Sequence, residues 1–236
     1  MQKHHMAKRA FRTLTLCVFL LGLTACGSDE DEPEEPTEAP AAAAAPEGCW
    51  TVEQRIDNLN EKPQWSSPPA MVIDQAKAYT ARFQTSLGGF TVELLPQDAP
   101  MTVNSFICLA QAGFFDGIGF HRIVTGFVVQ AGDPTGTGGG GPGYQFGDEL
   151  PTTLTYERGT LAMANAGPGT NGSQFFVCLT DLSQRLPPNY SIFGRVTEGM
   201  ESVDAIAGVT VQAGRSGEVS SPIDPVTITS VTVSEA

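Results

Sequence analysis

Basic residues and histidines are scarce in this chain of 236 residues. It has 13 lysines and arginines against 26 aspartates and glutamates, a formal net charge of −13 at pH 7. Proteins that bind nucleic acid neutralise phosphates with lysine and arginine, so this balance argues against a nucleic-acid partner. The three histidines are His4, His5 and His121, and neither they nor the cysteines have the spacing of a zinc site. We therefore expect no nucleic acid, no metal and no other cofactor.

The uncharged stretch near the N-terminus is too short to cross a bilayer, which takes about 20 apolar residues. It covers residues 13–25 and follows four basic residues between Lys3 and Arg12, the order that is typical of a secretory signal peptide. It ends in Leu23-Thr24-Ala25-Cys26, which resembles the lipobox of bacterial lipoproteins. We predict a lipoprotein signal peptide over residues 1–25, with Cys26 lipidated after cleavage. An ordinary signal peptide with an incidental cysteine is the alternative.

Residues 26–47 are rich in Asp, Glu, Pro and Ala and contain almost nothing that can be buried. Such a segment cannot repay the entropy lost on ordering, so we predict a disordered tether that begins at the lipidated Cys26. Acyl chains would keep the protein on a membrane surface. We expect an exported protein that is anchored to the cell membrane or the outer membrane and faces the periplasm or the cell exterior. Residues 48–77, with a possible helix over 51–60, are predicted to be an N-terminal extension that packs on the domain.

Three cysteines remain once Cys17 is removed with the signal peptide and Cys26 is lipidated. They are Cys49, Cys108 and Cys178, and an odd number is not typical of a disulfide framework. Cys108 and Cys178 lie among apolar neighbours. This favours buried free thiols over a bridge, although a disulfide stays open as the alternative.

Short strands and two helices are predicted from residue 78 onward. Tyr79, Ala81 and Phe83 alternate with polar residues, and a turn at 87–89 leads into a second strand over 90–95, which indicates a hairpin. Helical spacing of apolar residues predicts helices over 100–113 and 199–207. Further strands are predicted over 120–123, 127–131, 160–164, 175–178, 191–195 and 226–233. About eight strands with two helices predict a mainly β domain that closes into a barrel, because closure removes exposed sheet edges.

Two longer segments carry residues suited to chemistry. Residues 120–133 read FHRIVTGFVVQAGD, where strand alternation can present Arg122, Phe127 or Val128, and Gln130 on one face. A cation, an apolar residue and an amide together suit an apolar ring that is attached to an amide. Taken alone, the pattern fits a structural arginine and a core phenylalanine better. Residues 163–178 read MANAGPGTNGSQFFVC and change that balance.

Together the two segments closely resemble the cyclophilin family, and the resemblance extends over residues 79–233. It implies a closed eight-stranded antiparallel β-barrel capped by two α-helices over residues 78–236. It also implies a peptidyl-prolyl cis-trans isomerase that assists the folding of exported proteins. The implied partners are proline-containing peptides and exported client proteins, and a monomer is expected because this is usual for such domains. The alternative is a non-catalytic module of the same fold that binds proline-containing segments.

The resemblance also implies roles for individual residues. Arg122 matches the catalytic guanidinium, and Gln130 matches the amide that orients the substrate and the arginine. Phe127 matches the third member of this catalytic group and also a wall of the proline pocket. The remaining substrate-binding positions are Val128, where the family commonly has methionine, Ala164 and Asn165 on the backbone ledge, Phe176 and Leu186 in the pocket, and Tyr190 at its rim. His121 is expected to be a hydrogen-bonded structural histidine, and Arg185 replaces a tryptophan that better-known members carry.

Overall fold

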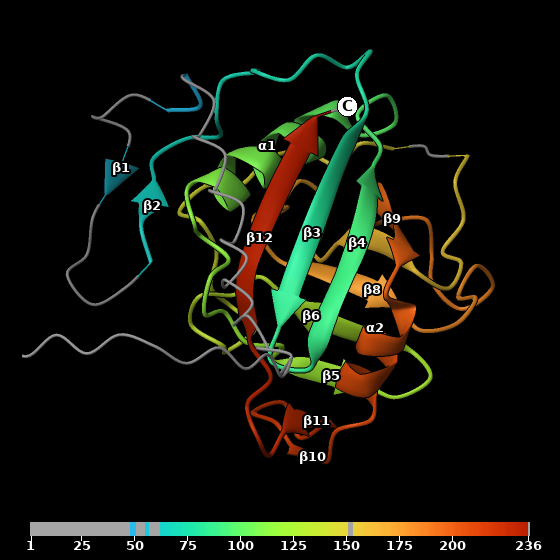
Figure 1. Ribbon diagram of the computed structural model, residues 1–236. Helices are drawn as coiled ribbons and strands as arrows, with labels where there is room; N and C mark the ends of the chain where they lie inside the picture. Colours follow the sequence, from blue (N-terminus) through green and yellow to red (C-terminus); the bar gives the residue numbers. More distant parts are fainter. Residues whose placement is uncertain (1–47, 51–54, 57–61, 151–152, 236) are drawn as a thin grey trace, which may run out of the picture. The chain divides into compact units, whose positions relative to one another are not determined.

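The computed structural model describes residues 48–50, 55–56, 62–150 and 153–235 (Figure 1). The predicted signal peptide, Cys26 and the tether lie outside the described residues. No helix within the described part has both the length and the apolar character to cross a membrane.

The described residues form twelve strands and two helices, so the chain is mainly β. In chain order they are β1 (Arg55–Ile56), β2 (Gln64–Trp65), β3 (Tyr79–Thr85), β4 (Gly88–Leu94), α1 (Pro100–Gln111), β5 (Arg122–Val124), β6 (Val128–Ala131), β7 (Thr160–Met163), β8 (Phe175–Cys178), β9 (Ile192–Glu198), α2 (Met200–Ala207), β10 (Val211–Ala213), β11 (Val219–Pro222) and β12 (Ile228–Glu235). The hairpin of β3 and β4 and both helices confirm the sequence predictions to within two residues at each end. The pairs β1–β2 and β10–β11 were not predicted. A helix over 51–60 is contradicted at Arg55–Ile56, which form β1, and the rest of that range lies outside the described residues.

The main sheet has eight strands in the order β12-β3-β4-β9-β7-β8-β6-β5, and every pair is antiparallel. The prediction of a closed barrel is wrong, because the end strands β12 and β5 do not pair and the sheet is an open half-barrel. A single antiparallel bridge, Gly119 with Thr227, joins the segments that precede these two strands. Beyond it the strands separate, and β5 lies beside β11 instead of β12 (Figure 1). Strand β5 therefore does not close the sheet into a barrel.

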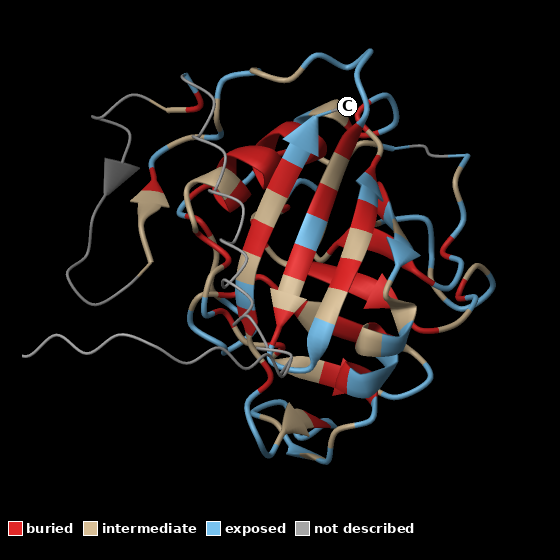
Figure 2. Ribbon diagram, viewed as in Figure 1, coloured by how far each residue is buried: buried red, intermediate tan, exposed pale blue. Residues whose placement is uncertain are grey.

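Period-two burial explains the outer strands of this sheet. Along β3, Tyr79, Ala81, Phe83 and Thr85 are buried while the intervening residues are not, and Figure 2 shows the same banding along β4 and β12. Phe83 pairs in register with Phe90 of β4, and their rings stack at 4.6 Å between centroids. One face of the sheet therefore supplies the aromatic core.

Strands β7 and β8 are buried at every position, because both of their faces are covered. Leu161, Phe175 and Val177 belong to the main core. Ala162, Phe176 and Cys178 belong to a second, smaller apolar cluster on the opposite face of the sheet. The predicted site residues Val128, Phe127, Leu186 and Tyr190 pack in this second cluster.

The N-terminal extension is fastened to the domain by a disulfide between Cys49 and Cys108, whose Cα atoms lie 5.9 Å apart. The preference for free thiols is therefore wrong for this pair, and it is confirmed only for the buried Cys178. The two cysteines are 59 residues apart, and only tertiary packing of the extension on α1 brings them together. Val72 N donates to Asn104 Oδ1 of α1 at 2.9 Å, and Trp65 N donates to Pro142 O at 2.8 Å.

Candidate active site

All nine residues predicted to be catalytic or to contact substrate line one pocket of about 370 Å³. They are Arg122, Phe127, Val128, Gln130, Ala164, Asn165, Phe176, Leu186 and Tyr190. This volume falls in the range of small-molecule and peptide side-chain sites, about 300–1,000 Å³. The pocket lies over the second apolar cluster.

The β5–β6 hairpin positions the cation, the amide and one wall of the pocket. Gly126 has φ 71°, in the left-handed region that favours glycine, and Phe127 N donates to Val124 O at 2.9 Å to close the turn. Because side chains alternate along a strand, Ile123 and Val129 enter the core and are fully buried. The register partners Arg122 and Gln130 thus face the pocket side.

Phe176 and Tyr190 build a further apolar wall of the pocket. Phe176 pairs in register with both Gln130 of β6 and Ala162 of β7. The ring of Tyr190 meets that of Phe176 at 5.5 Å and 87°, an edge-to-face contact. The hydroxyl of Tyr156 donates to Tyr190 O at 2.9 Å and accepts from Tyr190 N at 3.1 Å, which fixes the backbone of Tyr190. Burial raises the pKa of Tyr156, so this hydroxyl stays protonated.

The guanidinium of Arg122 is bound by a carboxylate that sequence reasoning did not identify. Nε donates to Glu218 Oε2 at 2.7 Å, and Nη2 donates to Glu218 Oε1 at 2.8 Å. Hydrogen bonding to Arg122 lowers the pKa of Glu218 below its usual range, so the pair is charged at neutral pH. The guanidinium carbon of Arg122 also lies 5.8 Å from the centroid of the Phe127 ring.

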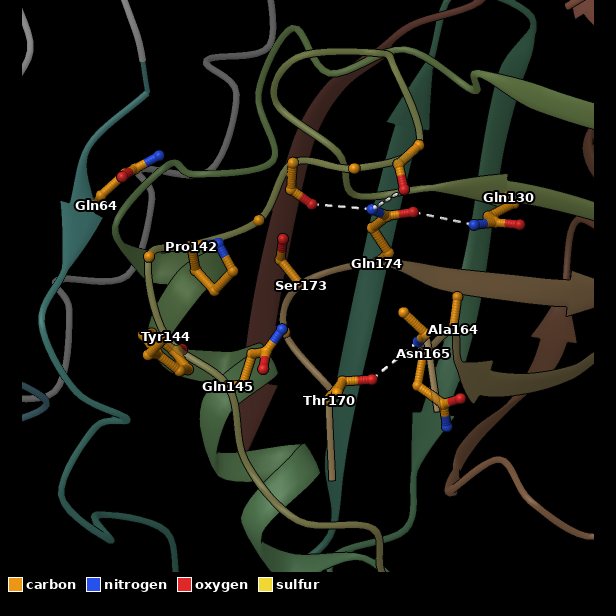
Figure 3. A pocket seen from close by; sticks show the side chains of 17 residues that line it. Gln64, Gln130, Pro142, Tyr144, Gln145, Ala164, Asn165, Thr170, Ser173 and Gln174 are labelled. Atoms are coloured by element: carbon orange, nitrogen blue, oxygen red, sulfur yellow. Dashed lines mark hydrogen bonds between the residues drawn. The ribbon is translucent and has the colours of Figure 1, made fainter. Parts of the chain in front are cut away.

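Gln130 does not orient Arg122 by a direct hydrogen bond, contrary to expectation. Its Nε2 donates to Gln174 Oε1 at 3.0 Å, and Gln174 Nε2 donates in turn to Gly138 O at 3.0 Å and Gly140 O at 2.9 Å (Figure 3). This relay connects β6, the residue directly before β8 and the glycine-rich loop of residues 138–141, and it fixes the amide plane of Gln130. Among the described residues no donor reaches Gln130 Oε1, which is therefore left to accept from a ligand.

A second hollow of about 400 Å³ adjoins the pocket and shares Gln130, Ala164 and Asn165 with it. Figure 3 shows its lining, with Gln174 and Gln130 on one side. Tyr144 and Pro142 lie on the other side, together with Gln64, which belongs to the N-terminal extension. The two hollows thus meet at these three shared residues. A ligand longer than the first pocket can extend from it toward the second hollow.

The backbone of Asn165 is available at the junction of the two hollows. Its side-chain Nδ2 donates to Asn189 O at 3.0 Å and to Asp148 Oδ1 at 3.3 Å, and these bonds fix the side chain while leaving the backbone free of them. Ala164 N donates to Gln174 O at 2.9 Å. Within the described residues no partner takes the N–H or C=O of Asn165. An exposed backbone donor and acceptor can pair with a peptide as an added strand does.

Arg185 and His121 flank the site without lining the pocket. Arg185 Nη1 donates to Gly126 O at 3.3 Å, and its guanidinium carbon lies 5.3 Å from the Phe127 ring centroid. The expectation that His121 is hydrogen-bonded is wrong. Both of its ring nitrogens are buried, and neither has a partner among the described residues. Burial lowers its pKa, so the ring is neutral at neutral pH.

The described residues contain no cluster of metal ligands and no activated thiol. No group of three or more His, Cys, Asp or Glu side chains there is arranged to hold a metal ion. The buried Cys178 thiol has its pKa raised to about 12 by burial, so it is not a nucleophile at neutral pH. What the site offers is a charged donor, an amide acceptor, a backbone ledge and an apolar pocket.

Comparison with known proteins agrees with this geometry. Residues 80–233 match the model of the family described as cyclophilin type peptidyl-prolyl cis-trans isomerase/CLD. A probable peptidyl-prolyl cis-trans isomerase B of Mycobacterium tuberculosis is 47% identical over 163 residues, covering 62% of this chain and 52% of the relative. A probable isomerase A of Mycobacterium leprae is 41% identical over 173 residues, covering 66% of this chain and 92% of the relative.

Solved structures show the same fold. The crystal structure of a cyclophilin type isomerase of Cryptosporidium parvum superposes with a TM-score of 0.61 at 34% identity, covering 66% of this chain and 98% of the other. A second structure of that protein, in the presence of the dipeptide Ala-Pro, gives a TM-score of 0.61 at 35% identity. The chain spans about half the length of the Mycobacterium tuberculosis relative. The family match over residues 80–233, the identity to these relatives and the shared fold show that the chain belongs to the cyclophilin type peptidyl-prolyl cis-trans isomerase family.

Proposed function

We propose that this protein catalyses rotation about X-Pro peptide bonds. The observation that carries the proposal is the convergence of Arg122, Phe127 and Gln130 in one pocket together with the backbone ledge at Asn165. The Cryptosporidium parvum relative, studied with the dipeptide Ala-Pro, supports a proline-containing peptide as the substrate.

The reaction needs no bond to break. Resonance gives the peptide C–N bond double-bond character and a rotation barrier of about 18–20 kcal/mol. The two isomers of an X-Pro bond differ by only about 0.5–1 kcal/mol, so the difficulty is kinetic. Raising the rate from about 0.01 to about 1,000 per second requires the barrier to fall by roughly 7 kcal/mol.

Arg122 supplies a contact that is stronger in the transition state than in the ground state. When the amide twists, the proline nitrogen regains its lone pair and becomes a hydrogen-bond acceptor. A guanidinium N–H aimed at that nitrogen lowers the barrier, because it stabilises only the twisted state. The guanidinium stays charged at any ordinary pH.

The rest of the site fixes the two sides of the X-Pro bond. Phe127, Phe176 and Leu186 bury the proline ring, while the Asn165 backbone and Gln130 Oε1 hold the flanking peptide. With both sides fixed, torsion about the amide is the remaining freedom. The apolar wall also keeps out water that would weaken the contact to Arg122.

The test is cis-trans exchange of a short Ala-Pro peptide, followed by NMR, with the protein and with its Arg122→Ala variant. Acceleration by the parent that is largely lost in the variant supports the proposal. A parent that is folded and binds the peptide but does not accelerate exchange would favour the binding module instead.

We further propose that the protein is exported and anchored by lipid on Cys26, with proline-containing exported proteins as its clients. The sequence of residues 1–47 motivates this proposal. The disulfide between Cys49 and Cys108 supports it, because disulfides persist in oxidising compartments outside the cytoplasm. Mass spectrometry of the N-terminal fragment from the native membrane would show the acyl mass on Cys26, and a Cys26→Ser variant should lose both that mass and membrane attachment. A soluble parent with an unmodified Cys26 would contradict the proposal.

A further inference from the structure

The carboxylate of Glu218 holds Arg122 from outside the pocket. Both of its oxygens accept from the Nε and Nη2 edge of the guanidinium, at 2.7 and 2.8 Å. Arg122 lines the pocket, whereas Glu218 does not. The carboxylate therefore leaves the substrate volume free while it binds one edge of the catalytic cation.

The fold builds this contact through the hairpin of β10 and β11, which lies beside β5 (Figure 1). A turn closed by Gly217 N to Gly214 O at 3.0 Å and Gly214 N to Glu218 O at 2.8 Å places Glu218 directly before β11. Gly217 has φ 83°, which a side chain would disfavour. Ser220, two residues further on, is buried and anchors the strand. Glu218 is thus presented from a folded turn.

The physical value of the contact lies in the length of the arginine side chain. A free arginine samples many rotamers, and the entropy of fixing it opposes any hydrogen bond that it makes in the transition state. A planar bidentate carboxylate pair selects one orientation of the guanidinium. Within the part of the chain that the structure describes, no acceptor takes the opposite edge with Nη1, which can donate to a substrate.

The inter-strand neighbour Gln130 does not hold the guanidinium. It faces Arg122 in register and its amide is turned to donate to Gln174 Oε1 at 3.0 Å, and within the described residues no hydrogen bond joins its own Oε1 to Arg122. Within the described residues Glu218 is the carboxylate that pairs with Arg122. Orientation of the catalytic cation is therefore assigned to a segment more than 90 residues away in sequence.

We propose that Glu218 is a positioning residue that orients the Arg122 guanidinium toward the twisted X-Pro amide. The inference rests on the proposed isomerase function and adds a residue to it. It requires that removing the carboxylate lower kcat while KM for a short Ala-Pro peptide changes little, because Glu218 acts on Arg122 in the transition state and does not touch substrate.

The experiment measures kcat and KM by NMR exchange for the full protein and for Glu218→Ala, Glu218→Gln and Glu218→Asp. We expect kcat to fall roughly fivefold or more in Glu218→Ala, the factor that corresponds to about 1 kcal/mol. Glu218→Gln keeps one acceptor and should be intermediate, and Glu218→Asp keeps the charge and should recover part of the loss. Thermal melting of each variant identifies any that fails to fold.

Asp204→Asn is the matched control. Asp204 accepts from Arg158 Nη2 through both oxygens, at 2.8 and 2.6 Å, in an ion pair that is more exposed than that of Glu218 and does not line the pocket. This variant should keep the parent kcat. A second arm combines Glu218→Ala with Arg122→Ala, and the combination should be no slower than Arg122→Ala alone, because Glu218 acts through Arg122.

The outcomes separate the inference from the proposed function. An active parent whose Glu218 variants, folded and stable, retain the parent kcat would overturn the positioning role and leave the isomerase intact. A rise in kcat in Glu218→Ala would also overturn it, because the carboxylate would then be competing with substrate for the guanidinium. A parent without activity would overturn the proposed function itself.

Discussion

Arg122 and Gln130 face each other across β5 and β6, yet each is held by a different partner: Arg122 by Glu218 and Gln130 by Gln174. The cation is therefore oriented from the β10–β11 hairpin and the amide, through Gln174, from Gly138 and Gly140. Replacing Glu218 or Gln174 therefore removes the partner of one group and not of the other, although Arg122 and Gln130 line one pocket.

Activity should be independent of pH between about pH 6 and 9, because no group in the proposed mechanism titrates there. Burial lowers the pKa of His121, so its ring is already neutral over most of this range. Glu218 has its pKa lowered by Arg122, so the ion pair is complete above the ordinary glutamate pKa and is lost as pH falls through the lower folded value. Exchange rates of the parent should decline only in acid, and Glu218→Gln should lack that decline while the fold persists. A steep change near neutral pH in an intact fold would count against this account.

Phe127→Ala should raise KM for an Ala-Pro peptide about tenfold, because the ring is a wall of the proline pocket. The loss of global stability should be small, since Phe127 is only partly buried at the edge of the second apolar cluster. Peptide titration by NMR and thermal melting measure the two effects separately. A large fall in melting temperature with unchanged KM would instead make Phe127 a core residue.

The disulfide between Cys49 and Cys108 should stabilise the domain without affecting the chemistry. It closes a loop of 59 residues between the extension and α1, and bridges of this kind contribute about 2–4 kcal/mol. Cys49→Ser with Cys108→Ser should lower the midpoint of urea unfolding and leave kcat near the parent value. Reductant should lower the midpoint of the parent but not that of the double variant. Equal midpoints for parent and double variant would show that the bridge contributes nothing.

Arg122→Lys should be nearly as slow as Arg122→Ala. Lysine keeps the charge, but it cannot make the bidentate pair with Glu218 while also presenting a donor to the proline nitrogen. We expect both variants to lose about 100-fold in kcat, as for removal of one transition-state donor. Substantial activity in Arg122→Lys would mean that charge alone suffices and that orientation matters little.

Local patterns were enough to predict much of the fold and of the pocket. Period-two alternation from Tyr79 to Phe83 and helical spacing in 100–113 depend on neighbours in sequence, so the β3–β4 hairpin and α1 were predicted correctly. The nine pocket residues were found through the resemblance of two contiguous segments, and the structure brings them together.

Features that depend on distant packing were not predictable. Closure of the sheet depends on whether β5 pairs with β12. No local sequence pattern predicts that β11 lies beside β5 instead. The Cys49–Cys108 pair depends on how the extension docks. Glu218 sits in a short polar turn without apolar periodicity, and an acidic residue there is indistinguishable in sequence from any exposed glutamate.

The measurement that tests the central claim most directly is exchange of an Ala-Pro peptide by the parent and by Arg122→Ala, with the affinity of each for the same peptide measured by titration. The account predicts that the parent accelerates exchange and that the variant loses most of this acceleration while its affinity stays within about threefold of the parent. Equal exchange rates for two folded proteins that both bind the peptide would contradict it, because Arg122 would then have no part in lowering the barrier.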